Sequence, residues 1–184
     1  MRSKIIQEIH QEMKKDKKIF FLTADMGINL VEKIENDFPD RFLNVGVAEQ
    51  NLIGIASGLI NTGYKVVAYT ISNFLVHRCF EQLRNDISLH NKPILLIGTS
   101  CGYDYAPLGP THHVVDDWGA LKNLPGFKVY CPSNISYCAG LFSRLINLEE
   151  SIYLRVPKGS FEENNSKDDY DFLETKSKNI FLTY

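Results

Sequence analysis

The clearest indication of the fold comes from residues 41–70, RFLNVGVAEQNLIGIASGLINTGYKVVAYT. Residues 41–45 predict a short extended segment, and residues 48–62 predict a helix that stops at Gly63. Residues 66–69 then predict a strand. Because a helix joins two extended segments, we expect these segments to lie parallel in one sheet.

The same alternation continues on both sides of this stretch. Further strands are predicted over residues 19–23, 94–97, 127–130 and 151–154, and further helices over residues 3–16, 28–36, 73–89, 116–123 and 134–147. Continuously apolar strands are typical of a sheet that is buried on both faces. We therefore predict an α/β fold with a doubly wound, mostly parallel sheet and helices on both faces. Residues 1–160 form the domain, and residues 161–184 form a polar, acidic tail or linker.

Composition excludes several classes of protein. The 184 residues suffice for one domain with a sizeable core, and 44% hydrophobic with 23% charged residues is typical of soluble globular proteins. No apolar run approaches the roughly 20 residues of a membrane span. The net charge of −2 provides no strong field for nucleic acid or acidic membranes.

The amino-terminal sequence and the cysteines indicate a reducing compartment. Residues 1–15, MRSKIIQEIHQEMKK, are too charged for a signal peptide, so a cytoplasmic location is expected. No CxxC pair and no Cys/His cluster with zinc-like spacing occurs. The four cysteines are therefore expected to be free thiols: Cys79, Cys101, Cys131 and Cys138.

Ligands of parallel sheets bind at the carboxyl ends of the strands, so the loops there hold the candidate site residues. Glu49 stands in the first turn of a predicted helix, where it either complements the helix dipole or faces a cleft as a buried carboxyl group. His112 and His113 follow the central strand, and adjacent histidines can bind metal, move protons or bind a polar substrate. Asp25 and Arg155 end the first and last strands, at the expected edge of the cleft.

Two glycines mark a possible packing face. Gly54 and Gly58 lie four residues apart and so share one side of the predicted helix. Glycine lowers helix stability, so two on one side indicate that another backbone or a neighbouring helix comes close.

Several segments, in order and at appropriate spacing, resemble a known family. They are TADMG at 23–27, residues 38–70 (the stretch 41–70 preceded by FPD), FEQLRNDI at 80–87, LGPTHH at 108–113 and LPGFKVYCPSN at 124–134. Together they resemble the pyrimidine-binding domain of the transketolase family of thiamine-diphosphate enzymes, which includes transketolase and 1-deoxyxylulose-5-phosphate synthase. The resemblance covers roughly residues 19–159.

The resemblance implies a cofactor site. In this family a glutamate at the position of Glu49 contacts N1′ of the aminopyrimidine, and the shared proton lets the imino form remove the C2 proton of the thiazolium. A carboxyl group does this best when it is partly buried, because burial raises its pKa. Phe74 matches an aromatic residue that stacks on the pyrimidine, and Ile71 is expected one helical turn before it. Asp25 matches an acidic residue near the cofactor pocket.

The resemblance also implies a substrate site. His112 matches a histidine that faces the substrate and hydrogen-bonds the donor carbonyl or hydroxyl, and His77 is assigned to the same site. His113 replaces the usual glutamine, and its role stays open. Arg155 resembles an arginine that binds substrate phosphate, for which its planar fork is suited.

Three further positions depart from the pattern of the family. Leu108 precedes Gly109 where many relatives carry aspartate, so a polar contact to a donor hydroxyl is missing. Ser100 and Cys101 stand where relatives place histidine or arginine for phosphate. A sugar-phosphate substrate is therefore less firmly predicted than the fold.

The Gly-Asp-Gly signature of the diphosphate and Mg²⁺ site is absent from the sequence. We therefore predict that this chain is the pyrimidine-domain subunit of a split, transketolase-like transferase that uses thiamine diphosphate. The expected reaction moves a two-carbon ketol unit between carbonyl compounds, which are sugars or sugar phosphates. A second subunit is expected to supply the diphosphate domain and the Mg²⁺ ligands, with no metal ligand on this chain. The expected assembly is a heterotetramer with two copies of each subunit.

Two alternatives remain from the sequence. The chain could serve a 2-oxo acid decarboxylase or dehydrogenase, whose beta subunit shares the domain. It could also be a non-catalytic binding module that retained the fold, although Glu49, Phe74 and His112 argue against a mere scaffold.

Overall fold

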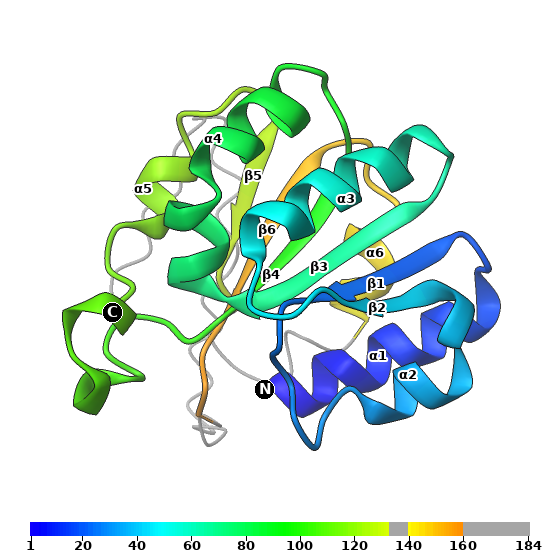
Figure 1. Cartoon of the computed structure of the whole chain (residues 1–184), viewed down its shortest axis with the longest axis horizontal. Coiled ribbons are helices and arrows are strands. Elements are labelled where there is room, and N and C mark those ends of the chain that lie inside the picture. The colour runs from blue at the N-terminus through cyan, green and yellow to red at the C-terminus, as the bar shows by residue number, and fades with distance from the viewer. Residues whose placement is uncertain (133–139, 160–184) are drawn as a thin grey trace, which may run out of the picture.

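A parallel sheet forms the centre of the computed structural model, which describes residues 1–132 and 140–159 (Figure 1). Within these residues the sheet has six strands: β1 (Ile19–Thr23), β2 (Phe42–Asn44), β3 (Lys65–Ile71), β4 (Ile94–Thr99), β5 (Phe127–Tyr130) and β6 (Ser151–Val156). They lie in the order β2-β1-β3-β4-β6-β5, and every neighbouring pair is parallel. The predicted parallel sheet is confirmed.

Helices cover both faces of this sheet. The α-helices are α1 (Arg2–Lys15), α2 (Glu32–Asp37), α3 (Glu49–Asn61), α4 (Phe80–Gln82), α5 (Asp117–Leu121) and α6 (Leu141–Leu145). Short 3₁₀ turns are η1 (Pro39–Arg41), η4 (Ala106–Leu108) and η5 (Pro110–His112), and π-helical turns are η2 (Phe74–Arg78) and η3 (Leu83–Ser88). Helices α1, α2 and α6 pack on one face, and α3, α5 and the segment η2–η3 pack on the other, as a doubly wound fold requires (Figure 1).

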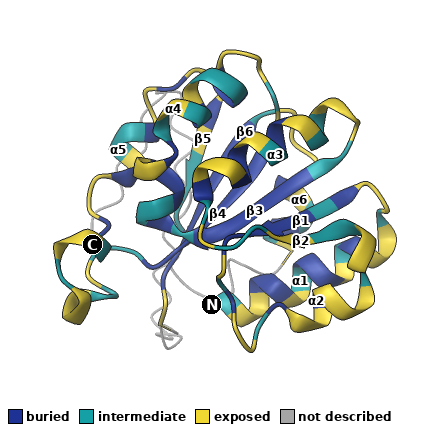
Figure 2. Ribbon diagram, in the orientation of Figure 1, coloured by how far each residue is buried: buried dark blue, intermediate teal, exposed yellow. Residues whose placement is uncertain are grey.

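Alternating strand residues build the two halves of the core. Phe21, Val67 and Leu95 point to the face of α1, whereas their strand neighbours Leu22 and Leu96 point to the face of α3. All are buried, as Figure 2 shows for most of the sheet. Each buried side chain of this size contributes about 1.5–3 kcal/mol, so the continuous apolar strands stabilise both layers at once.

Two predicted helices differ in detail. The helix expected from residue 28 begins only at Glu32, because Gly27 (φ 100°) and Asn29 (φ 64°) take left-handed backbone conformations. The helical segment 73–89 is present but is wound largely as η2 and η3. Residues 134–139 of the helix expected over 134–147, and the tail 161–184, lie outside the described residues.

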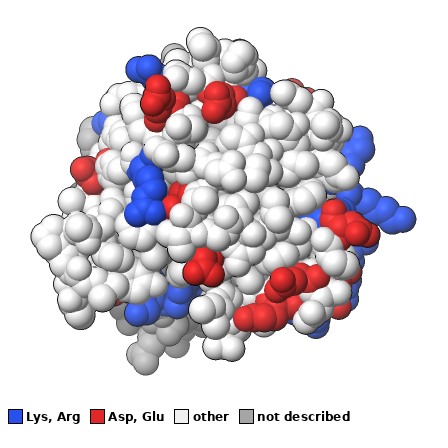
Figure 3. All heavy atoms as spheres, in the orientation of Figure 1, with Lys and Arg blue, Asp and Glu red and all other residues white. Residues whose placement is uncertain are grey.

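The two glycines of α3 face open space rather than a neighbouring helix of this chain. A Cβ atom added to Gly54 or Gly58 would meet no atom within 4 Å. The expected close neighbour is therefore absent from the part of the chain that the structure describes. Figure 3 shows that the surface over α3 is largely uncharged, with charged side chains gathered mostly toward the rim.

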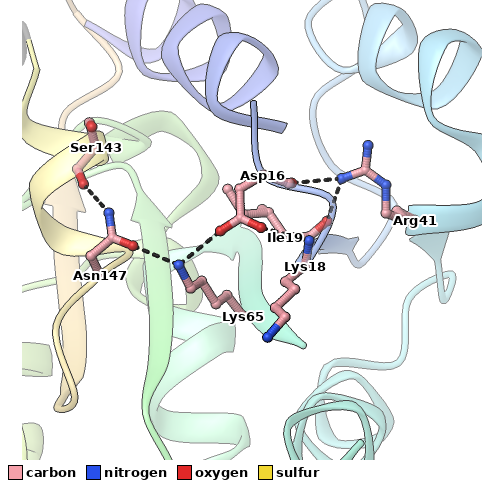
Figure 4. A network of polar contacts seen from close by, with 7 residues as sticks. All are labelled: Asp16, Lys18, Ile19, Arg41, Lys65, Ser143 and Asn147. Atoms are coloured by element: carbon pink, nitrogen blue, oxygen red, sulfur yellow. Dashed lines mark hydrogen bonds and ion pairs between the residues drawn. The ribbon is translucent and has the colours of Figure 1, made fainter. Parts of the chain in front are cut away.

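A polar network joins the amino-terminal ends of the strands (Figure 4). Lys65 donates hydrogen bonds to Asp16 at 2.8 Å and to Asn147 at 2.6 Å. Arg41 donates to the main-chain oxygens of Asp16 and Ile19, both at 3.1 Å. The hydrogen bond from Lys65 holds the pKa of Asp16 below its ordinary value. This network fixes the edge of the sheet opposite the carboxyl ends.

The strand order reverses between β1 and β3, because the chain passes from β1 to β2 on one side and then returns to β3 on the other. Ligands of open parallel sheets bind outside the carboxyl ends at such a reversal. At the carboxyl end of β4, close packing requires Gly98, since an added Cβ would lie 2.5 Å from Ser72 Oγ and 2.6 Å from a ring carbon of Tyr153.

Candidate functional site

Glu49 opens α3 beside the strand-order reversal and is almost fully buried, with 2% of its surface exposed. The loops that lead to it are held by Asn44, whose Oδ1 accepts hydrogen bonds from the main-chain N–H groups of Asp25 at 2.9 Å and Gly46 at 3.0 Å. Gly46 turns the chain toward α3 with φ at 73°. Of the two roles open for Glu49, this burial favours the carboxyl group that faces a cleft.

Arg78 of η2 joins Glu49 to Phe74. Its Nη1 donates a hydrogen bond to Glu49 Oε2 at 2.5 Å, and its Cζ lies 4.1 Å from the centre of the Phe74 ring. The Glu49 side chain is 3% exposed and that of Arg78 is 41% exposed, so the guanidinium lies on the outer side of the pair. Sequence reasoning missed both contacts of Arg78. The contact with Phe74 has a local signal, because the two residues stand four apart, at the spacing of neighbours on a helix.

The loop after β4 brings His112 to Phe74. The two ring centres lie 5.1 Å apart in an edge-to-face arrangement. Asn73 Nδ2 donates a hydrogen bond to the main-chain oxygen of Thr111, which fastens the loop to the start of η2. Thr111 Oγ1 and His112 Nδ1 lie 3.0 Å apart. Glu49, Phe74 and His112, three of the predicted site residues, therefore belong to one cluster of contacts.

Two further residues that sequence reasoning missed extend this cluster. The ring of Tyr105 lies 6.2 Å from that of His112, and Lys158 Nζ lies 4.5 Å from the centre of the Tyr105 ring. The contacts thus form one row, here called the site row: Glu49, Arg78, Phe74, His112, Tyr105 and Lys158. In the site row, the buried carboxylate can bind a ring nitrogen and the aromatic face can stack on a planar ring. The imidazole and the exposed ammonium can bind a polar or anionic group.

Arg155 is the residue before the last of β6, at the carboxyl end of the sheet as predicted, but its side chain turns inward. It is 5% exposed, its Nε donates to Asp117 Oδ2 at 2.9 Å, and its Nη2 donates to the main-chain oxygen of Val114. Tyr153 also donates to Asp117 Oδ2, at 2.6 Å. The fully buried Asp117 draws the guanidinium inward, where it holds the segment that follows His112.

The other predicted residues lie around the cluster. Ile71 is the last residue of β3, so its expected position one helical turn before Phe74 is wrong. His77 is exposed, with Nε2 2.9 Å from Asp116 Oδ1. Asp25 is exposed at φ 48°, in the loop after β1. The ring of His113 packs against that of Tyr103, with centres 4.9 Å apart.

The thiols are poor candidates for catalysis. Burial and, to a smaller extent, the nearby charge of Glu49 raise the pKa of Cys79 to about 12. Burial likewise raises the pKa of Cys101 to about 12 and that of Cys131 above its ordinary value. These three cysteines are free, and Cys138 lies outside the described residues. Since a thiolate is the reactive form, these thiols are inert near neutral pH.

Neither a metal-binding cluster nor a membrane-spanning helix occurs among the described residues. No group of three or more His, Cys, Asp or Glu residues within 1–132 and 140–159 could hold a metal ion. None of the helices in these ranges has the length and apolar character to cross a membrane.

The fold and the site row define a parallel α/β domain with a candidate ligand site at the carboxyl edge of its sheet. The chain belongs to the transketolase pyrimidine-binding domain family, whose model, described as "Transketolase, pyrimidine binding domain", matches residues 1–163. The predicted family is thereby confirmed.

Similar proteins include subunits of divided transketolases. One subunit of the apulose-4-phosphate transketolase of Actinobacillus succinogenes is 35% identical over 137 residues, which cover 74% of this chain and 44% of that protein. A putative transketolase C-terminal section of Methanocaldococcus jannaschii is 29% identical over 150 residues, 81% of this chain and 48% of that protein. A solved split-gene transketolase, described as an inactive beta4 tetramer, superposes with a TM-score of 0.78 at 27% identity, covering 91% of this chain and 54% of that one. The chain thus spans about half the length of these relatives.

Proposed function

We propose that this chain is the pyrimidine-domain subunit of a split, transketolase-like transferase that depends on thiamine diphosphate. The reaction is transfer of a two-carbon ketol unit between two carbonyl compounds, which are sugars or sugar phosphates. The observation that carries the proposal is the buried Glu49 carboxylate beside the half-buried Phe74 ring, at the edge where the strand order reverses. The two divided transketolase proteins among the relatives support the split arrangement.

The residues present fit the aminopyrimidine end of the cofactor. Glu49 can share a proton with a ring nitrogen, and Phe74 offers a face on which a planar ring can stack. When bound, thiamine diphosphate supplies the nucleophilic carbon that attacks a carbonyl group. We propose that the partner subunit binds its diphosphate and Mg²⁺, since the described residues offer no metal-ligand cluster.

The remaining residues of the site act on the substrate. His112 is proposed to hydrogen-bond the donor carbonyl or hydroxyl, and its ring is oriented by contacts with Phe74 and Tyr105. Arg155 is proposed to position the segment after His112 through Asp117 and Val114, in place of an exposed phosphate contact. Asp25 and Ile71 are proposed as further cofactor contacts, and His77 as a further substrate contact.

The proposed assembly is a heterotetramer in which two copies of this chain meet through α3. Gly54 and Gly58 leave part of the exposed side of α3 without side chains, which allows a second backbone to approach closely. The surface over α3 is largely uncharged (Figure 3), so burying it removes few charges from water. The beta4 tetramer of the split-gene relative supports self-association of such subunits.

Glu49→Gln tests the assignment. The variant is expected to fold and to bind the partner, while C2-proton exchange of thiamine diphosphate in the two-chain enzyme falls by at least about a hundredfold, the usual contribution of a positioned acid or base. Glu81→Gln, an exposed change in α4, is the matched control and should leave exchange unchanged. Exchange retained by Glu49→Gln would refute the assignment of Glu49.

A further inference from the structure

We propose that Arg78 occupies the aminopyrimidine position in the free subunit, so that cofactor and guanidinium exclude each other at Glu49 and Phe74. This inference rests on the proposed function, because it takes these two residues as the cofactor contacts. It adds an autoinhibitory contact to them. The chain by itself holds its cofactor residues closed, and loading the enzyme requires Arg78 to leave.

The geometry places one group against both cofactor contacts. Arg78 Nη1 lies 2.5 Å from Glu49 Oε2 while its Cζ lies 4.1 Å from the centre of the Phe74 ring. A guanidinium is planar, donates hydrogen bonds and stacks on aromatic faces. An aminopyrimidine that approaches the same carboxylate and the same ring needs the same two contacts.

Burial explains why the free chain keeps Arg78 there. The Glu49 side chain is 3% exposed, and a buried carboxylate without a partner is strongly disfavoured. Arg78 supplies the missing charge from the solvent side, where 41% of its own side chain stays exposed. Its side chain can therefore swing into water without being extracted from a core, whereas Glu49 cannot.

The backbone of Arg78 is anchored independently of its side chain. Gln50 Nε2, in the first turn of α3, donates a hydrogen bond to the main-chain oxygen of Arg78 at 3.0 Å. The π-helical turn η2 carries Phe74 and Arg78 at its two ends, and single π turns occur often at functional sites. Release of the guanidinium thus requires side-chain rotation alone, with η2 and the start of α3 kept in place.

Carboxyl labelling of the full chain tests whether the Arg78 side chain shields the Glu49 carboxylate. With a carbodiimide and an amine, Glu49 of the wild type should react far more slowly than the exposed Glu81, as read by peptide mass spectrometry. Arg78→Gln should raise the labelling rate of Glu49 toward that of Glu81, because glutamine is shorter than arginine and carries no charge that holds it against the carboxylate. Arg84→Ala, an exposed change on the same segment, should leave the rate unchanged. An unchanged Glu49 rate in Arg78→Gln would overturn the proposal.

Cofactor saturation of the two-chain enzyme tests the exclusion. A closed form that holds about 90% of the free site weakens apparent affinity about tenfold, so Arg78→Gln should lower the half-saturating thiamine diphosphate concentration by up to that factor. A higher half-saturating concentration would overturn the proposal, since Arg78 would then assist binding. In the wild type, cofactor loading should also speed modification of Arg78 by phenylglyoxal, and slower modification would contradict displacement.

Failure of the proposed function has a different signature. If neither wild type nor variant binds thiamine diphosphate with the partner present, the cofactor assignment is wrong. The labelling experiment on the chain alone would still show whether Arg78 covers Glu49.

Discussion

Removing Asp117 should destabilise the chain far more than removing an exposed ion-pair partner. Asp117 is fully buried and accepts hydrogen bonds from Tyr153 at 2.6 Å and from Arg155 at 2.9 Å. Asp117→Ala removes the buried carboxylate that pairs with the 5%-exposed Arg155, and breaking a buried pair in this way costs about 3–5 kcal/mol of unfolding free energy. For a chain of this size that corresponds to a fall in Tm of about 6–20 °C.

The assay is equilibrium unfolding in urea. An unchanged slope m would verify that the variant and the wild type expose the same amount of surface on unfolding. The control is Lys128→Ala, because Lys128 and Glu150 pair on the surface with side chains 53% and 41% exposed. Such pairs contribute no more than about 1 kcal/mol. A loss in Asp117→Ala no larger than that in Lys128→Ala would show that the buried pair does not stabilise the fold as described.

Three further changes probe other parts of the fold. The lowered pKa of Asp16 means that its pairing with Lys65 stabilises the fold above the ordinary pKa of 3.8, and that this stabilisation is lost as pH falls through the lower pKa of the folded state. The urea midpoint of Asp16→Asn should therefore fall less between pH 6 and pH 3 than that of the wild type. Equal falls would contradict this. Gly98→Ala should cost about 1–3 kcal/mol in urea unfolding, because its Cβ would lie 2.5 Å from Ser72 Oγ, and a neutral result would contradict the close packing. Gly58→Ala should leave the free chain at least as stable but weaken its self-association in sedimentation experiments; unchanged association would argue against a contact through α3.

Local patterns were sufficient to predict the strands and the fold class. The runs 19–23 and 127–130 were predicted with the bounds that the structure has, because each is a short segment rich in apolar residues between turn residues. The burial of the Arg155 side chain was not foreseen, because the sequence does not show that Asp117, 38 residues earlier, is its buried partner. Likewise Arg78 was missed because Glu49 lies 29 residues before it, and only the packing of α3 against η2 brings them together.

The resemblance located the centre of the site better than its surroundings. Glu49, Phe74 and His112 were identified by motifs and lie in one row of contacts. Ile71 was expected one helical turn before Phe74 because the strand predicted over residues 66–69 stopped two residues short of the end of β3. Tyr105 and Lys158 lie in a loop and beyond a strand end, where no periodicity constrains the side chains.

In the function proposed above, this chain supplies the pyrimidine half of a cofactor site that it shares with a second subunit. Calorimetric titration tests this sharing, with thiamine diphosphate and Mg²⁺ added to the chain alone and to the chain mixed with a diphosphate-domain subunit that carries Gly-Asp-Gly. We expect binding only in the mixture. Tight binding by this chain alone, or no binding in a mixture whose two chains associate, would contradict a shared site.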